Sequence, residues 1–169
     1  ATIRYRIHAG YAPDEVPDVQ GVLINAAKRA SSAAAGIVQS QSVNGSSVTY
    51  NVTHAAGDEK PTLNMVLMQR SQDILAANNW NVCQYAILLM MVAQSVGMVA
   101  GELLHVIVDA HIYDRHVDIV RELIGRPQFP APTVRLNPEV TNFYDFTTDD
   151  LIVENYQTGP QVKGIPIAV

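Results

Sequence analysis

The sequence predicts an α+β fold, and three features of its pattern support this. Polar and apolar residues alternate over Val48, Tyr50 and Val52, with the two-residue period of a half-buried strand. From Asn81 to about Met98 the apolar residues follow a helical pattern instead. Strands and helices interleave along the chain without the strict βαβ repetition of a parallel α/β sheet, so we expect α+β.

The composition is typical of a cytosolic globular domain. Of the 169 residues, 48% are hydrophobic and 16% are charged, which is enough for one domain with a buried core. A formal net charge of -5 argues against a general nucleic-acid binder, because such a protein normally carries a basic face. The single cysteine excludes an internal disulfide and a cysteine-based metal cluster. No signal-peptide pattern is visible, and because the first residue is Ala1, processing or truncation stays open.

One apolar run, from Tyr85 to Val108, is long enough to be tested as a membrane span, which needs about 20 apolar residues. Polar residues and glycines interrupt this run: Gln94, Ser95, Gly97, Gly101, Glu102 and His105. We therefore expect a buried helix followed by a buried strand, and no membrane partner.

Several elements are expected before this run. The alanine-rich segment Val19–Ala35 predicts a helix. The small, polar segment Gln39–Ser47 predicts a loop. After the alternating strand, Leu63–Met68 predicts a second strand, and Gly57–Lys60 between the two could close a hairpin.

The elements after the long helix are shorter. Leu103–Val108 predicts a buried strand ending in Asp109-Ala110-His111. Asp114 is the expected N-cap of a further helix. The residues of that helix expected to face inward are Val117, Val120, Leu123 and Ile124. The proline-punctuated remainder predicts short strands near Thr133–Leu136 and Leu151–Glu154.

A candidate anion site lies in Gln69-Arg70-Ser71-Gln72-Asp73, at the end of the second strand. The Arg70 guanidinium offers a planar fork of donors that matches a phosphate or carboxylate, and the Ser71 hydroxyl adds another donor. The alternative is an ordinary surface pair of Arg70 with Asp73, which would stabilise the protein little.

Asn81 opens the long helix directly after Trp80. Its amide presents one acceptor and two donors, a set that can pair with a planar base edge such as the imide of uracil. Asparagine is also a common N-cap, and from position alone the cap is the stronger interpretation.

Polar side chains also close the buried strand. Alternation places Asp109, His111 and Tyr113 on one face, and three convergent polar groups indicate a pocket or a structural polar network. His105 shares that face, which raises a metal site, but no supporting ligand spacing occurs elsewhere and we expect no metal.

Cys83 is the only candidate thiol nucleophile. A position near a helix N-terminus can lower the pKa of a thiol. Its neighbours Val82, Ala86 and Ile87 are apolar, so we expect Cys83 to be a small buried residue instead.

Taken together, these segments resemble the thymidylate synthase family. The resemblance runs in order from about Leu63 to the carboxy terminus, roughly three-fifths of the chain. The segments that carry it are Gln69-Arg70-Ser71-x-Asp73, Trp80-Asn81-Val82-Cys83-Gln84-Tyr85, Gly101-Glu102, Asp109-Ala110-His111-Ile112-Tyr113 with His116, Arg126-Pro127 with Pro130, Phe143-Tyr144-Asp145-Phe146, Tyr156 and Ala168-Val169. Such an ordered run is far more specific than any single motif within it.

The resemblance implies methylation of dUMP to dTMP with 5,10-methylenetetrahydrofolate. In that family a cysteine thiolate adds to C6 of dUMP, and C5 then attacks the methylene group of the folate. The substrate-binding residues that it implies are Arg70 and Ser71 at the phosphate, Asn81 at the uracil edge, and His111 and Tyr113 at the ribose hydroxyl. For the cofactor it implies Asp73 at the pterin ring and the carboxylate of Val169 in a tail that closes over the site.

The nucleophile that the family requires is missing. In the family it lies in a Pro-Cys-His motif one hairpin before Gln69-Arg70-Ser71. Counting back places that motif near Ser47, Val48, Thr49 and Tyr50, where no cysteine occurs. Ser47 or Thr49 would be a poor substitute, because a hydroxyl forms almost no anion without an adjacent base. We therefore expect normal turnover to be absent.

The cofactor side departs from the family as well. Ala77-Asn78-Asn79 stands where the family usually has Gly-x-Pro, and Ile107-Val108 replaces a glycine pair, so side-chain volume increases at both places. Lys28-Arg29 lies at about the distance of the arginine pair that reaches the partner subunit's phosphate.

We therefore expect one domain over residues 1–169, with a divergent or truncated part over 1–47 and a recognisable core over 48–169. The resemblance implies a mixed sheet packed by a long buried helix and shorter helices, and a cytoplasmic homodimer formed through a sheet face. Two alternatives stay open: a non-catalytic protein that binds pyrimidine nucleotides on this fold, and a nucleotide hydroxymethylase. The Asn81 amide argues against a cytosine substrate.

Overall fold

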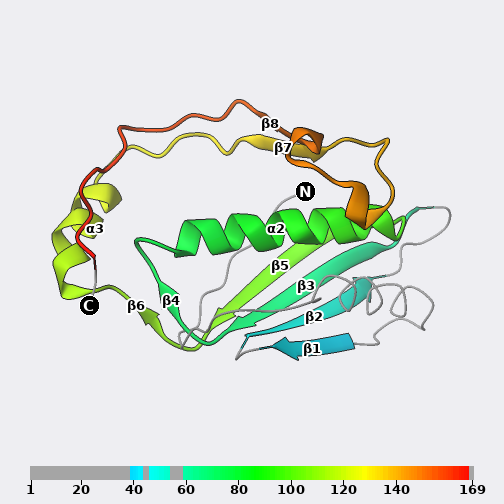
Figure 1. The fold of residues 1–169 in the computed structure, drawn as a ribbon, viewed down its shortest axis with the longest axis horizontal. Helices are drawn as coiled ribbons and strands as arrows, with labels where there is room; N and C mark the ends of the chain where they lie inside the picture. Colours follow the sequence, from blue (N-terminus) through cyan, green and yellow to red (C-terminus); the bar gives the residue numbers. More distant parts are fainter. Residues whose placement is uncertain (1–38, 44–45, 54–58, 168–169) are drawn as a thin grey trace.

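The computed structural model describes residues 39–43, 46–53 and 59–167, arranged as strands around one long helix (Figure 1). The elements, in chain order, are β1 (Gln39–Val43), β2 (Ser46–Thr53), β3 (Thr62–Gln69), β4 (Gln72–Asp73), α2 (Asn78–Ser95), β5 (Val99–Ile107), β6 (Ala110–His111), the 3-10 turn η1 (Asp114–His116), α3 (Val117–Ile124), β7 (Thr133–Leu136), the 3-10 turns η2 (Phe143–Asp145) and η3 (Thr148–Asp150), and β8 (Leu151–Glu154). The expected helix over Val19–Ala35, the pair Lys28-Arg29 and Val169 lie outside the described residues.

The main sheet has the strand order β1-β2-β3-β5 and is mixed. β1 pairs with β2, and β2 with β3, in the antiparallel sense, whereas β3 and β5 are parallel. A parallel pair cannot be joined by a tight turn, and α2 supplies the crossover between β3 and β5. The α+β prediction is confirmed.

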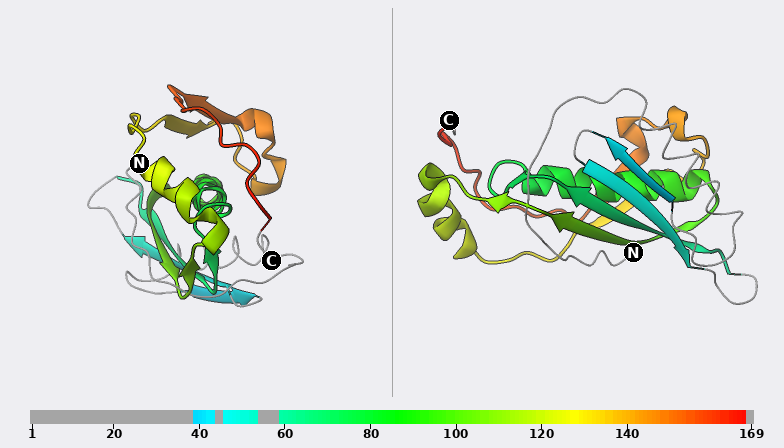
Figure 2. Two further views of the ribbon diagram at one scale, coloured as in Figure 1. Left: turned by 90° about the vertical axis from the view of Figure 1, so that its left-hand side faces the viewer. Right: turned by 90° about the horizontal axis from the view of Figure 1, so that it is seen from below.

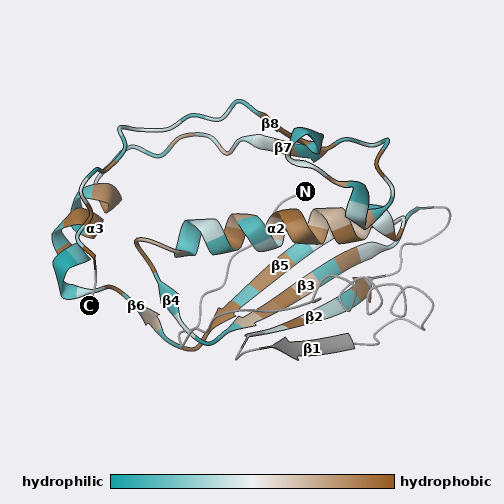
Figure 3. Cartoon of the chain, in the orientation of Figure 1, coloured by the Kyte–Doolittle hydropathy of each residue, from teal (hydrophilic) through white to brown (hydrophobic). Residues whose placement is uncertain are grey.

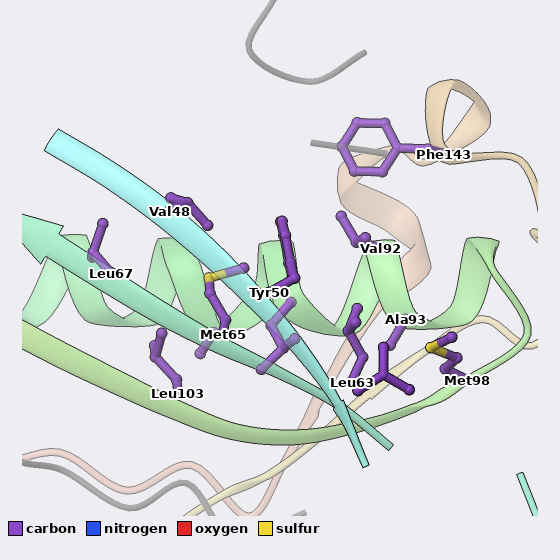
Figure 4. Packing of buried hydrophobic residues seen from close by; sticks show 13 residues of the cluster. Val48, Tyr50, Leu63, Met65, Leu67, Val92, Ala93, Met98, Leu103 and Phe143 are labelled. Carbon is purple, nitrogen blue, oxygen red and sulfur yellow. The ribbon is translucent and has the colours of Figure 1, made fainter. Parts of the chain in front are cut away.

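The core lies between one face of this sheet and α2, as Figure 4 shows. Alternate residues of β2, β3 and β5 point to the helix because successive side chains of a strand face opposite sides. The buried members on the sheet are Val48, Tyr50, Val52, Leu63, Met65, Leu67 and Leu103. On α2 they are Ala86, Leu89, Val92 and Ala93, at the spacing of one helix stripe.

A one-residue bulge adjusts the register of β5 against β3. Leu63 pairs with Ala100, yet Met65 pairs with Leu103, so β5 holds one extra residue there. Gly101 lies in this bulge, and a Cβ at its position would come within 2.3 Å of the Asn64 Oδ1. That oxygen accepts a hydrogen bond from the Glu102 backbone N–H at 2.9 Å. A side chain at position 101 would therefore have to displace the Asn64 amide, and with it this hydrogen bond.

A third layer covers the side of α2 opposite to the sheet, as the end-on view in Figure 2 shows. The β7–β8 hairpin and η2 belong to it, and Phe143 of η2 packs into the core cluster. The Gln94 side chain of α2 donates to the backbone oxygens of Asn137 at 2.8 Å and Val140 at 2.6 Å. Hydrogen bonds from Asn137 and Thr147 hold the pKa of the Asp150 carboxyl below its ordinary value at the turn into β8.

Some of the expected elements differ from those in the structure. Gln39–Ser47 is not a loop, because β1 spans Gln39–Val43 and β2 already begins at Ser46. This segment forms a strand through antiparallel backbone pairing with β2, although its sequence is small and polar and has no apolar alternation. The long helix begins at Asn78 and ends at Ser95, since Gly97 adopts a φ of +73° and turns the chain into β5. The strands β7 and β8 have the expected bounds.

The helix expected after Asp114 differs most from the prediction. Residues Asp114–His116 form a 3-10 turn, α3 begins at Val117 with His116 as its N-cap, and no residue of α3 is buried. Ile124 is 75% exposed, so the prediction that its side chain faces inward was wrong. Figure 3 shows α3 at one end of the structure, with apolar and polar segments around it. None of the helices in the described ranges combines the length and apolarity of a membrane span.

Candidate functional site

The candidate site lies where β3 and β5 end. Both strands are parallel, so their carboxyl ends meet at one edge of the sheet, where ligands commonly bind in such arrangements. Just beyond this edge β4 pairs with β6, and Asp73 lies opposite His111. Backbone hydrogen bonds of 3.1 Å, from Gln72 N–H to Asp109 O and from Val108 N–H to Gln69 O, hold the two segments together. The structure thus joins the two motifs that the sequence analysis treated separately.

Asn81 of α2 faces this edge. The Gln69 Nε2 donates to the Asn81 Oδ1 at 3.3 Å, which ties the first turns of the helix to the end of β3. The N-cap of α2 is Ala77, and no side chain caps the helix there. The interpretation of Asn81 as an N-cap is therefore wrong, and the half-buried amide lies at the site instead.

Ser71 and His111 come together from the two strand ends. Ser71 is buried, and its Oγ lies 3.5 Å from the His111 Nδ1, a long hydrogen bond. The same nitrogen lies 3.2 Å from the Asp109 backbone oxygen and 3.6 Å from its Oδ2. The Tyr113 ring packs edge-on against the His111 ring, with centroids 5.1 Å apart. These residues follow β5 rather than continuing it, because the strand ends at Ile107.

Arg70 and Asp73 flank Ser71 in different ways. The Arg70 side chain is exposed at the edge of the site. Asp73 uses Oδ1 to accept hydrogen bonds from the backbone N–H groups of Leu75 at 2.9 Å and Ala76 at 3.1 Å. This is an Asx-type turn, and it shapes the chain between β4 and α2. The Asp73 carboxylate is thus engaged by the backbone of its own loop.

Gln69 makes contacts that its place in the Gln69–Asp73 motif did not predict. Its Nε2 donates to the Ser71 backbone oxygen at 2.9 Å as well as to Asn81, and its Oε1 lies 2.8 Å from the His105 Nε2. His105 is almost completely buried, and this burial lowers the pKa of its imidazole. The only signal in the sequence was the position of Gln69 at the end of an apolar strand.

Within residues 39–43, 46–53 and 59–167, no group of three or more His, Cys, Asp or Glu side chains could hold a metal ion. His105 instead bonds to the Gln69 amide.

The four residues at the expected place of the nucleophile lie on β2. Val48 and Tyr50 point into the core, and burial raises the pKa of the Tyr50 hydroxyl above its ordinary value. Ser47 pairs with Met68, so of the four it lies nearest to the site edge. Thr49 pairs with Val66, which is farther from that edge.

Cys83 is exposed, so the expectation of a small buried residue was wrong. The buried stripe of α2 passes through Val82 and Ala86, and Cys83 falls outside it. Because a helix turns about 100° per residue, Cys83 lies about 200° around the axis from Asn81. Its thiol therefore faces away from the site.

The C-terminal segment reaches the same end of the molecule. The buried His116 side chain bonds through Nε2 to the Pro166 backbone oxygen at 2.8 Å, and the Arg115 Nη1 donates to the Ile167 oxygen at 3.1 Å. His116 also contacts the Tyr113 ring, with centroids 5.7 Å apart. The segment before Val169 is thus held beside the Tyr113 side of the site.

Comparisons with known proteins point in one direction. The family model described as thymidylate synthase matches residues 41–169. The thymidylate synthases of Leuconostoc mesenteroides subsp. mesenteroides and Oenococcus oeni are 40% and 39% identical over 107 residues, which are 63% of this chain and 33% of each of those proteins. The solved structure of thermostable thymidylate synthase A from Bacillus subtilis matches with a TM-score of 0.64 and 36% identity, over 71% of this chain and 41% of that chain. The chain spans about one third of the length of the curated relatives it matches.

The turn at Asp73 yields a prediction about stability. Asp73→Ala removes the acceptor of two backbone N–H groups and should lower the free energy of unfolding by about 1 kcal/mol, as loss of a helix cap does. Asp73→Asn keeps a side-chain oxygen at the same place, and we expect a loss of less than about 0.5 kcal/mol. Urea denaturation of both variants checks this. Equal losses in both would show that the charge, rather than the turn, is what stabilises the loop.

Proposed function

The chain belongs to the thymidylate synthase family, and we propose that it binds dUMP at the edge where β3 and β5 end. The reaction that we propose for this site is methylation of dUMP to dTMP with 5,10-methylenetetrahydrofolate. The observation that carries the proposal is the convergence on one edge of the sheet of Ser71 from the link between β3 and β4, Asn81 from α2 and His111 from β6.

The proposed contacts follow the chemistry of the nucleotide. The exposed Arg70 guanidinium and the Ser71 hydroxyl bind the phosphate, because both donate to anionic oxygens. The Asn81 amide pairs with the uracil edge, which presents both a donor and an acceptor. His111 and Tyr113 bind the ribose hydroxyl, and their edge-on contact keeps the two side chains adjacent.

The residues present fit the proposed folate in part. Both hydrogen bonds in the Asp73 turn use Oδ1. The turn does not use Oδ2, which would accept a hydrogen bond from the pterin ring. Ile107 is buried and Val108 exposed, so of the two residues that replace the glycine pair only Val108 adds volume at the surface. When bound, the folate supplies the one-carbon unit and the hydride; Asp73 and the Val169 carboxylate would hold it.

We propose that the 169-residue chain by itself does not turn over. Its single cysteine, Cys83, faces away from Asn81, and the hydroxyls of Ser47 and Thr49 form almost no alkoxide at neutral pH. The comparisons lend no support to the two alternatives, a non-catalytic binding protein and a hydroxymethylase. A cytoplasmic location is proposed as well, because a single cysteine gives no disulfide framework of the secreted kind.

We also propose that two copies associate through the face of the sheet that points away from α2. Apolar side chains of β3 and β5, and of the residue that follows β5, gather on that face and are exposed or half-buried: Val66, Met68, Leu104, Val106 and Val108. They lie side by side, because Val66 pairs with Leu104 and Met68 with Val106. Such a patch is unusual on a monomer, and one surface can pair with itself across a two-fold axis.

The binding proposal is tested by calorimetry with dUMP and with deoxyuridine, which lacks the phosphate. Arg70→Ala should weaken dUMP binding about tenfold to a hundredfold, since a charge-assisted hydrogen bond is lost, and should leave deoxyuridine binding unchanged. The matched control is Arg121→Ala, which removes an exposed arginine paired with Asp118 on α3 and should change neither. If the wild-type chain does not bind dUMP, the proposed function is wrong.

A tritium-release assay tests turnover. With dUMP labelled at C5 and 5,10-methylenetetrahydrofolate, we expect no release above the uncatalysed background, because no thiolate is available to attack C6. Turnover at about 1 per second or faster, the usual range of enzymes, would contradict this. Cys83→Ser is the control, because any release that depends on Cys83 disappears in it.

The dimer is tested by sedimentation velocity at micromolar protein. Met68→Lys places a charge in the centre of the proposed interface and should convert a dimer to monomers. The control Val153→Lys makes a similar change on β8, where the side chain is 48% exposed against 45% for Met68, and should leave the dimer intact. If the wild-type chain sediments as a monomer, the proposed dimer is wrong.

A further inference from the structure

One edge of the main sheet is formed by β1. It is the outermost of the described strands on that side, and β2 is the one described strand that pairs with it (Figure 1). Its other side presents backbone N–H and C=O groups that no other described strand pairs with, and such a row is a template for a strand of another chain. We propose that β1 is a second self-association surface, at which it pairs in the antiparallel sense with β1 of another copy of this chain.

The sequence around β1 contains none of the features that normally protect an edge strand. Natural sheets protect an edge with charged side chains, a proline or a β-bulge. From Ala30 to Thr53 the sequence has no charged residue, no histidine and no proline. The five residues of β1 pair with β2 without a shift in register, and this is an ordinary length for a strand. The edge is therefore regular and uncharged.

The other edge strands of the described ranges differ from β1. At the opposite edge of the main sheet, β5 contains the bulge at Gly101 and the exposed side chain of Glu102. In the β7–β8 hairpin each strand carries a charged side chain, and Arg135 of β7 pairs with Glu154 of β8. Of these four strands, β1 is the one with neither a charge nor a bulge, so strand addition is expected at β1 rather than at the others.

A second copy of the chain fits this edge by its charge and by its symmetry. The formal net charge of -5 makes two copies repel each other, and an uncharged strand is where they approach with the least repulsion. Full antiparallel overlap of Gln39–Val43 with itself places Ser40 opposite Ser42, and Gln41 opposite Gln41, across a two-fold axis. No like charges meet in this register. The two four-stranded sheets would then form one continuous sheet.

This surface is distinct from the face that we propose for the dimer. That face lies on β3 and β5, whereas β2 separates β1 from β3. A short strand supplies few hydrogen bonds, each with a modest net free energy, and association costs entropy. We therefore expect pairing through β1 at about 0.1 to 1 mM protein, well above the micromolar range of the dimer formed through the face.

Sedimentation velocity at about 0.5 mM protein tests the inference in the Met68→Lys chain, in which the face carries a charge. We expect this chain to form dimers at that concentration. Adding Gln41→Lys or Gln41→Glu should weaken the association about tenfold, because like charges then lie directly opposite each other. An equal mixture of the two variants should restore the dimer, because opposite charges now meet. The control Thr133→Lys adds the same charge at an exposed position of β7 and should leave the dimer intact.

The outcomes separate this inference from the proposed function. If the Met68→Lys chain stays monomeric at about 0.5 mM, or if both Gln41 variants associate as it does, the inference is wrong. Failure of dUMP binding, or of the dimer at micromolar protein, leaves this result unchanged, so the proposals fail separately.

A cross-linking measurement decides if a charge at position 41 prevents folding. Gln41→Cys, combined with Met68→Lys and Cys83→Ser, has its one thiol at the centre of the proposed strand pair. Directly opposite residues of an antiparallel pair are close enough for a disulfide, so oxidation at the same concentration should join two copies. The matched control carries Thr133→Cys in place of Gln41→Cys and should stay monomeric. Absence of the disulfide in the Gln41→Cys chain overturns the inference.

Discussion

The parallel pairing of β3 with β5 is the constraint on which the rest of the structure depends. Since the chain must cross from the end of one strand to the start of the other, α2 packs along the sheet between them. The helix begins at the edge where both strands end. The neighbouring stretches Gln69–Asp73 and Asn81 therefore reach one place with the distant stretch Asp109–Tyr113.

That edge is also where the layer between sheet and helix changes from apolar to polar. Leu63, Met65 and Leu67 contact the core, and Gln69 occupies the next position on the same face of β3. A glutamine here is tolerated because each of its polar atoms has a partner in the protein. A satisfied polar group in a low-dielectric layer also permits few alternative arrangements, so it favours one geometry of the surrounding side chains.

The sequence predicts the elements that have a face buried in the core, because burial leaves a pattern of apolar residues in the sequence. Alternation locates β2 and β3, and an apolar run marks β5, because one face of each strand contacts the core. It does not predict β1, because the small, polar sequence of this strand has no apolar alternation and its backbone pairing with β2 cannot be read from the sequence. It places Cys83 wrongly as well, because apolar neighbours do not reveal on which side of the buried stripe a residue falls. For the site, the phosphate, base and ribose residues come from family resemblance, whereas the bond between His105 and Gln69 joins residues 36 positions apart and depends on strand register.

The bulge at Gly101 determines which side chains of β5 face α2. Side chains of a strand alternate with a period of two, so one extra residue reverses the parity of everything that follows it. With the bulge, Leu103, His105 and Ile107 face α2, and Leu104 and Val106 face outward. Deleting one residue between Ala100 and Glu102 would leave the composition of β5 almost unchanged, yet it would exchange the two faces. The imidazole of His105 would then lie on the outer face of the sheet. The site at the strand ends therefore depends on the one extra residue that the bulge adds eight residues before Asp109.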